Sequence, residues 1–221
     1  MFGLDDKVAT LSDGTTILLV IVVAVVLGLR HASDPDHVAA VTTLITSGKD
    51  RAARSAARLG LVWGFGHATS LFVFGLPIVL YRAYLPEPVQ RAAETAVGLM
   101  IVLLALVLLR RLRHPPHVRR TRKPLQAYAI GLVHGTGGSA GIGVLLLASI
   151  RSHGLAVASL AVFAVCTALS MAALSGGFGL TLSRPAVSRS FAKLAPAIGL
   201  TSLAFGIWYA LGAQHLAPYP L

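Results

Sequence analysis

Long apolar runs dominate this chain and leave it few possible folds. A helix needs about 20 mostly apolar residues to cross a bilayer. Six runs of suitable length and composition lie at residues 15–46, 59–81, 95–109, 125–150, 155–182 and 191–211. They are continuous and rich in Leu, Ala and Val, without the polar alternation of barrel strands. The sequence therefore predicts an all-α, polytopic membrane bundle of about six transmembrane helices.

Composition and charge agree with a membrane protein. Hydrophobic residues make up 55% of the chain and charged residues 12%, with a mean hydropathy of +0.75. A net charge of +11 could suit a nucleic-acid partner, but most Lys and Arg lie around residues 49–58, 110–123 and 184–193, in the first, third and fifth connections. This placement is typical of cytoplasmic loops, so we predict a multi-pass protein of the cell (inner) membrane with no nucleic-acid partner. By the positive-inside rule, both termini are expected to lie outside.

A short pattern occurs twice, as Gly28-Leu-Arg-His31 and as Gly131-Leu-Val-His134. Each copy lies in the first span of a three-span half. Because three is odd, two such halves insert with opposite orientations, and binding sites in this plan lie where the halves meet. We predict a single transmembrane domain over residues 1–221. Its parts are repeat one at about 15–113, a basic cytoplasmic loop at about 110–124 and repeat two at about 125–213.

Charged and imidazole side chains interrupt the first apolar run between residues 28 and 37. Charge in hydrocarbon costs a few kcal/mol per residue, so such a cluster is expected to bind something or to pair internally. Imidazole and carboxylate together suit a divalent metal. Cys166 is the only cysteine, which excludes a thiolate-rich site. Nitrogen and oxygen donors are therefore the expected ligands.

Pro35 predicts a kink within this run. Proline lacks an N–H, so the carbonyl of His31 loses its usual helical partner and is expected to be free beside the cluster. The residues that a kink would bring together are His31, Asp34, Asp36 and His37. In the alternative interpretation, Arg30 pairs with one of the two aspartates and the histidines only form hydrogen bonds between helices.

Two further histidines lie in glycine-rich parts of other spans. Three glycines precede His67, which would let another helix approach closely. His134 opens the segment 134–143, in which five of ten residues are glycine, so a break or re-entrant turn is expected there. Both histidines are candidate ligands or interhelical hydrogen-bond donors. Thr136 and Ser139 are further candidate oxygen donors.

Three motifs resemble the nickel/cobalt transporter family (NiCoT/NicO). The first is His31-Ala-Ser-Asp-Pro-Asp36-His37, a histidine followed after four residues by Asp-His. The second is Trp63-Gly-Phe-Gly-His67-Ala-Thr-Ser. The third, Val133-His134-Gly-Thr-Gly-Gly-Ser-Ala140, is similar to a segment of the short six-helix branch often called UreH-type urease-accessory membrane proteins.

This resemblance implies a secondary transporter of Ni²⁺ or Co²⁺, with the ion as cargo, no prosthetic group and no enzymatic activity. It makes His31, Asp36 and His37 the leading metal ligands, with Asp34, His67 and His134 as contributors. By this comparison, we expect neither the extra leading helix of eight-helix uptake members nor the long histidine-rich loop of efflux members. Nickel or cobalt, uptake or efflux, and the coupling ion stay open.

Two other classes of function remain alternatives. An exporter of a small anion or amino acid could use the same inverted plan, with Arg30 pairing the substrate. An intramembrane metal-dependent enzyme could use the same histidines, although the chain has no His-Glu-x-x-His helix. A homo-oligomer and a partner in metalloenzyme maturation are also open.

Overall fold

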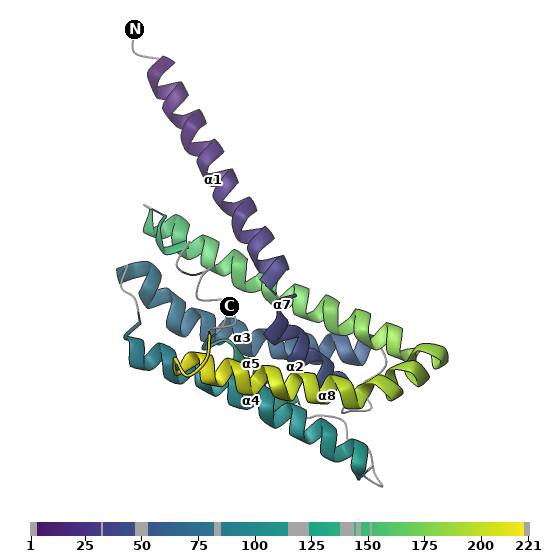
Figure 1. The fold of residues 1–221 in the computed structure, drawn as a ribbon. Coiled ribbons are helices and arrows are strands. Elements are labelled where there is room, and N and C mark those ends of the chain that lie inside the picture. Colours follow the sequence, from purple (N-terminus) through teal and green to yellow (C-terminus); the bar gives the residue numbers. More distant parts are fainter. Residues whose placement is uncertain are drawn as a thin grey trace.

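The computed structural model describes residues 4–31, 33–46, 53–81, 85–114, 124–137, 144, 147–150 and 152–218. Every regular element in these ranges is an α-helix, as predicted (Figure 1). The helices are α1 (Leu4–His31), α2 (Pro35–Thr46), α3 (Ala53–Tyr81), α4 (Glu87–Arg113), α5 (Pro124–His134), α7 (His153–Ser183) and α8 (Pro185–Ala213).

Four helices are long and apolar enough to cross a membrane: α3, α4, α7 and the Lys193–Ala213 part of α8. They confirm the spans predicted at 59–81, 95–109, 155–182 and 191–211. A shorter apolar segment, Ile17–His31, forms the second half of α1. Large apolar side chains are exposed along these helices, as expected for surfaces that contact lipid. The chain is a multi-pass helical membrane protein.

The first predicted span, residues 15–46, is two helices rather than one. A turn at Ser33 and Asp34 separates α1 from α2, and Pro35 is the first residue of α2, where its missing N–H is not needed. The backbone N–H of Asp34 donates to the carbonyl of His31 at 3.1 Å. The expectation of a free carbonyl at His31 is therefore wrong, because the turn itself supplies the donor.

The run predicted at residues 125–150 is also interrupted. Its helix α5 ends at His134, and a turn follows through residues 135–137. The predicted break thus begins directly after the histidine. Both α1 and α5 end on the histidine of a Gly-Leu-x-His pattern.

The helices α3 and α7 form the centre of the bundle and run antiparallel. A Cβ added at Gly60 would meet the side chain of Ser175, and one added at Gly75 would lie 3.3 Å from the side chain of Leu160. The first half of α3 therefore packs on the second half of α7, and the second half of α3 packs on the first half of α7. Small residues at these points let the two backbones approach closely.

The helices α4 and α8 pack in the same antiparallel manner. A Cβ added at Gly98 would lie 2.8 Å from the backbone nitrogen of Ala210, and one added at Gly206 would lie 2.9 Å from that of Val102. The contact is thus reciprocal: each helix places a glycine on the backbone of the other.

The ends of α1 and α5 pack on α7 and α3 in matching ways. A Cβ at Gly28 would lie 2.7 Å from the carbonyl oxygen of Phe163, and a Cβ at Gly131 would collide with that of Trp63. These glycines bring α1 onto α7 and α5 onto α3.

Matching hydrogen bonds join the same helix pairs. The hydroxyl of Ser170 on α7 donates to the carbonyl of Leu29 on α1 at 2.8 Å. The hydroxyl of Ser70 on α3 donates to the carbonyl of Leu132 on α5 at 2.6 Å. Each serine satisfies a carbonyl in the last turn of a helix that ends within the bundle.

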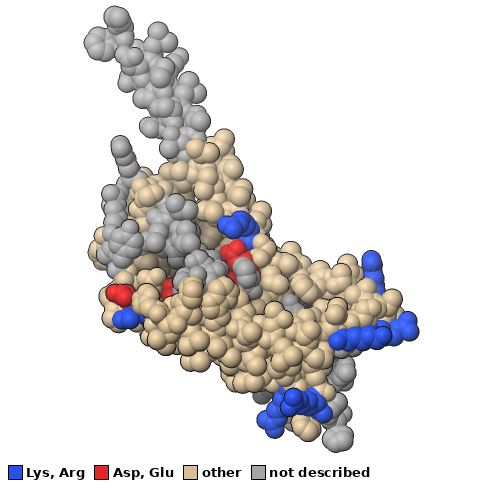
Figure 2. Space-filling model, viewed as in Figure 1, with Lys and Arg blue, Asp and Glu red and all other residues tan. Residues whose placement is uncertain are grey.

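Basic residues gather at one end of the bundle. Helix α4 ends in Arg110, Arg111 and Arg113, and Arg184 lies at the α7–α8 turn. Because α4 and α8 are antiparallel, the end of α4 lies beside the start of α8. Figure 2 shows most of the drawn Lys and Arg at this end of the molecule.

Candidate metal site

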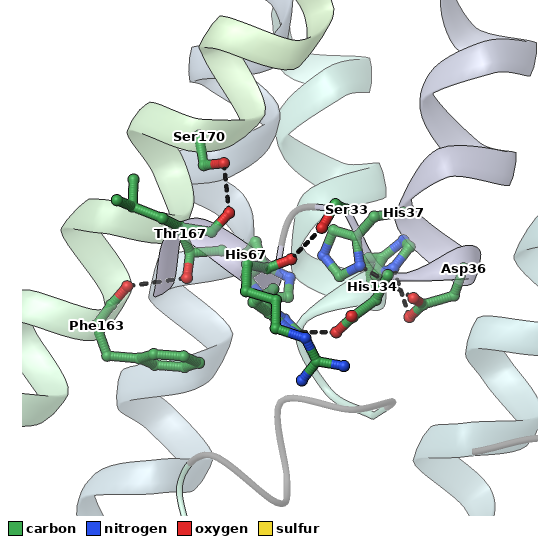
Figure 3. Close-up of polar contacts among 12 residues, drawn as sticks. Ser33, Asp36, His37, His67, His134, Phe163, Thr167 and Ser170 are labelled. Carbon is green, nitrogen blue, oxygen red and sulfur yellow. Dashed lines mark hydrogen bonds and ion pairs between the residues drawn. The ribbon is translucent and has the colours of Figure 1, made fainter. Parts of the chain in front are cut away.

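Four helices contribute polar side chains to one buried cluster. His31 ends α1, Asp36 and His37 lie in the first turn of α2, His67 lies in the middle of α3 and His134 ends α5. All five side chains are buried. The predicted kink is thus a complete break, and it turns the start of α2 toward α3 and α5. In Figure 3, the rings of His37 and His134 point toward the carboxylate of Asp36.

The carboxylate of Asp36 joins two histidines from different helices. Its Oδ1 lies 3.1 Å from Nδ1 of His37, and its Oδ2 lies 3.1 Å from Nε2 of His134. One carboxylate therefore links the start of α2 to the end of α5, a segment far away in the sequence. In the described part of the chain, the ion-pair partners of Asp36 are His37 and His134 and not Arg30, so the alternative interpretation is not met at Asp36. Arg30 itself is exposed.

His31 and His67 face each other across α1 and α3. Their Nε2 atoms lie 3.2 Å apart. Two nitrogens bound to one tetrahedral ion, each at about 2.0–2.1 Å, would lie about 3.3 Å apart. The other ring nitrogen of His31, Nδ1, lies 3.1 Å from Asp34 Oδ2. A carboxylate on the far side of a histidine ring is the arrangement that orients metal-bound histidines.

His37 lies at the centre of the cluster. Its ring centroid lies 4.5 Å from that of His31, 5.1 Å from that of His67 and 4.2 Å from that of His134. The indole of Trp63 packs beside it, at 5.6 Å from His37 and 5.5 Å from His134. Trp63, itself buried, therefore forms an aromatic wall on one side of these two imidazoles.

Three ring nitrogens of the cluster are buried without a hydrogen-bond partner among the described residues. They are Nε2 of His37, Nδ1 of His67 and Nδ1 of His134. An unsatisfied buried polar group costs roughly 1–3 kcal/mol. A bound cation would give at least one of these nitrogens a partner.

The cluster contains two groups of three donors, each with its ligand atoms within 4.8 Å of one another. The first group is His31, His37 and His67, and the second is Asp36, His37 and His134. Imidazole and carboxylate suit divalent ions such as Ni²⁺, Co²⁺ and Zn²⁺. The donors fit a transition metal.

The other candidate donors lie at the edge of the cluster or away from it. Asp34 contacts His31 but is 12% exposed. The hydroxyl of Thr136 donates to the carbonyl of Val133 in its own chain segment, at 2.7 Å. Ser139 lies outside the described residues.

A further buried carboxylate, in α4, was not predicted from the sequence. Glu94 is buried and accepts a hydrogen bond from the side-chain amide of Gln90 at 3.1 Å. A Cβ added at Gly137, three residues after His134, would lie 3.1 Å from the Cα of Glu94. Glu94 directly precedes the apolar run predicted at 95–109, so the pattern marked it as a boundary residue. Its burial depends on the turn after α5, which sequence periodicity does not describe.

The fold and the cluster together define a class of protein: a multi-pass helical membrane protein with buried histidine and aspartate donors where its helices meet. The model of the NicO family, described as "High-affinity nickel-transport protein", matches residues 17–115. This segment includes His31, Asp36, His37 and His67. The resemblance to nickel/cobalt transporters that the motifs indicate is thereby confirmed.

Similarity to a curated protein extends over most of the chain, well beyond residue 115. The urease accessory protein UreH of Bacillus sp. (strain TB-90) is 27% identical over 216 residues, covering 89% of this chain and 92% of that protein. Neither name is that of an enzyme, in agreement with the sequence-based expectation. No solved structure matches the chain.

Proposed function

We propose that this chain is a secondary transporter that carries a divalent transition-metal ion, Ni²⁺ or Co²⁺, through the membrane. The observation that carries the proposal is the central position of His37, a buried imidazole surrounded by three other histidines and a carboxylate. Buried ionisable groups at membrane depth are characteristic of ion pathways. The match to the NicO family supports a metal as the cargo.

The proposed ligands come from four helices. His31, His37 and His67 bind through imidazole nitrogens, and Asp36 and His134 supply a carboxylate and a further imidazole. Asp34 orients the ring of His31 through its 3.1 Å contact with Nδ1. Transport requires an ion that is released again, so the protein donors leave part of the coordination sphere to water.

Matching contacts support two inverted repeats within one transmembrane domain. Gly28 corresponds to Gly131, and Ser70 to Ser170, because each pair makes equivalent contacts in the two halves. The helices α3 and α7 therefore correspond to each other, yet they run antiparallel. Two halves that correspond and point in opposite directions are inverted repeats, in which rocking of one half against the other gives alternating access.

In this correspondence between the repeats, Thr167 of repeat two takes the position that His67 has in repeat one. The backbone nitrogen of Thr167 lies 3.2 Å from a Cβ added at Gly28, and that of His67 lies 2.9 Å from a Cβ added at Gly131. Only repeat one therefore supplies an imidazole at this position. The proposed site is asymmetric, with most of its ligands on repeat one and His134 contributed by repeat two.

The charge distribution supports the predicted orientation. The end of the bundle that carries Arg110, Arg111, Arg113 and Arg184 faces the cytoplasm of a cell membrane, and both termini lie outside. The relative named as a urease accessory protein suggests that the cargo supplies a metalloenzyme during its maturation.

Uptake into proteoliposomes tests this function. Purified wild-type protein is expected to give saturable uptake of Ni²⁺ or Co²⁺, measured against Zn²⁺ and Mn²⁺. Asp36→Asn is expected to lower uptake at least about tenfold, because the amide keeps the shape of the side chain but lacks the negative charge of the carboxylate. His153→Ala, at an exposed histidine that starts α7, is the matched control and is expected to transport normally. Uptake by Asp36→Asn equal to wild type would contradict the proposed site.

A further inference from the structure

The two groups of donors in the cluster share one residue. His37 belongs both to the group with His31 and His67 and to the group with Asp36 and His134. The first group lies wholly on α1, α2 and α3, whereas the second also takes His134 from α5. A shared ligand between two adjacent groups gives an ion a route from one to the other.

The two nitrogens of the His37 ring face different surroundings. Nδ1 lies 3.1 Å from Oδ1 of Asp36, on the side of the second group. Nε2 is buried and has no hydrogen-bond partner among the described residues. Since Nδ1 is engaged by Asp36, Nε2 is the nitrogen left for the group that contains His31 and His67. An imidazole has donors on opposite sides of its ring, so it can bind an ion on either side.

We propose that the site holds one divalent cation at two successive positions on opposite ring nitrogens of His37. The histidine position consists of His31, His37 and His67. The mixed position consists of Asp36, His37 and His134. This inference rests on the proposed function and specifies how the cargo moves within the same cluster. Two dications on one imidazole would repel each other strongly in a buried site, so the positions are occupied in turn.

Exposure gives the order of the two positions in this conformation. His31 contacts Asp34, which is 12% exposed, while Asp36 and His134 are fully buried. In the proposed order the ion therefore enters at His31, the least buried donor of the cluster at 4% exposure, and occupies the histidine position first. There, Asp34 and Asp36 accept hydrogen bonds from the Nδ1–H groups of His31 and His37 and orient the rings.

In the mixed position the role of Asp36 changes from orienting group to ligand. The carboxylate then compensates part of the cation's charge deeper in the protein. The neutral ring of His37 carries one proton, so the move of the ion from Nε2 to Nδ1 is coupled to loss of the Nδ1 proton to water and uptake of a proton from water at Nε2. Because His134 comes from the second half of the chain, this transfer moves the ion from one half to the boundary between the two halves.

The test compares variants that each damage one position. His67→Ala removes a ligand of the histidine position only, and His134→Ala removes a ligand of the mixed position only. Co²⁺ binding is measured by equilibrium dialysis, and its visible absorption spectrum reports the ligand set. Each variant is expected to bind one Co²⁺ per chain. Its affinity for Co²⁺ is expected to be about 10–100-fold weaker than that of wild type. The two spectra are expected to differ, and the double variant to lose binding.

Uptake provides the second measurement. Both single variants are expected to transport at least tenfold more slowly than wild type, because each blocks one of two consecutive steps. Size-exclusion chromatography selects folded protein, and His67→Gln and His134→Gln replace any alanine variant that does not fold. His153→Ala controls for loss of a histidine outside the cluster.

The outcomes separate this inference from the proposed function. Equal loss of Co²⁺ binding in both variants with the same residual spectrum would show a single position and overturn the inference, although wild-type transport would stand. Two Co²⁺ ions bound at once to wild type would also overturn it. A wild-type protein that neither binds nor transports the metals would refute the proposed function itself.

Discussion

Replacing His37 with alanine is expected to abolish metal binding and metal uptake together. His37 is the centre of the cluster and belongs to both groups of donors. Loss of an outer residue that only orients a ligand typically costs 10–100-fold in metal affinity, so loss of this central ligand is expected to cost at least about 100-fold. Equilibrium binding of Ni²⁺ to purified protein measures the change in affinity.

The same variant is expected to remain folded. The alanine removes a ring that contacts Asp36 at 3.1 Å, but it also removes the buried Nε2 that has no partner in the described part of the chain. The two effects oppose each other in the free energy of unfolding. Chromatographic behaviour like that of wild type, combined with lost Ni²⁺ binding, is the expected pattern. Unchanged Ni²⁺ affinity in the folded variant would remove His37 from the site.

Substituting Gly131 with alanine is expected to disrupt the junction between α5 and α3. The added methyl group would collide with the carbonyl oxygen of Trp63 and would lie 2.9 Å from the backbone nitrogen of His67. These are backbone atoms of a central helix and cannot move aside as a side chain would. Overpacking of this kind costs roughly 1–3 kcal/mol. Displacement of the α5 end would also move His134 and weaken metal binding.

Thermal unfolding in detergent measures this effect, with two comparison variants. Gly177→Ala on α7 is the matched control, because a Cβ there would meet nothing within 4 Å, and it is expected to be neutral or slightly stabilising. Gly28→Ala is expected to destabilise as Gly131→Ala does, since its Cβ would lie 2.7 Å from the carbonyl oxygen of Phe163. A transition temperature for Gly131→Ala equal to that of Gly177→Ala would argue against the close helix junction.

Helix type and most residues of the buried cluster could be predicted from the sequence because both have local causes. Apolar runs of membrane length predicted α3, α4, α7 and α8. Pro35 predicted an interruption beside His31, since a missing N–H is a property of the residue itself. The density of ionisable groups in an apolar segment is also a local signal, and it indicated the start of α2 as a candidate site.

The remaining features depend on contacts between distant segments. That both oxygens of Asp36 contact histidines, one of them His134 on α5, follows from how α5 packs on α3, which no local pattern encodes. The turn that satisfies the His31 carbonyl depends on the backbone path through Asp34. The burial of Glu94 depends on the neighbouring turn at Gly137.

The claim that the buried histidines and Asp36 bind the transported metal is tested most directly by X-ray absorption at the nickel edge. The measurement uses wild-type protein loaded with one equivalent of Ni²⁺, with His37→Ala as the comparison. The account predicts a spectrum with at least two imidazole ligands at about 2.0–2.1 Å in wild type, and none in the variant. A wild-type spectrum of Ni²⁺ surrounded only by water oxygens, or an imidazole count that stays the same in His37→Ala, would contradict it.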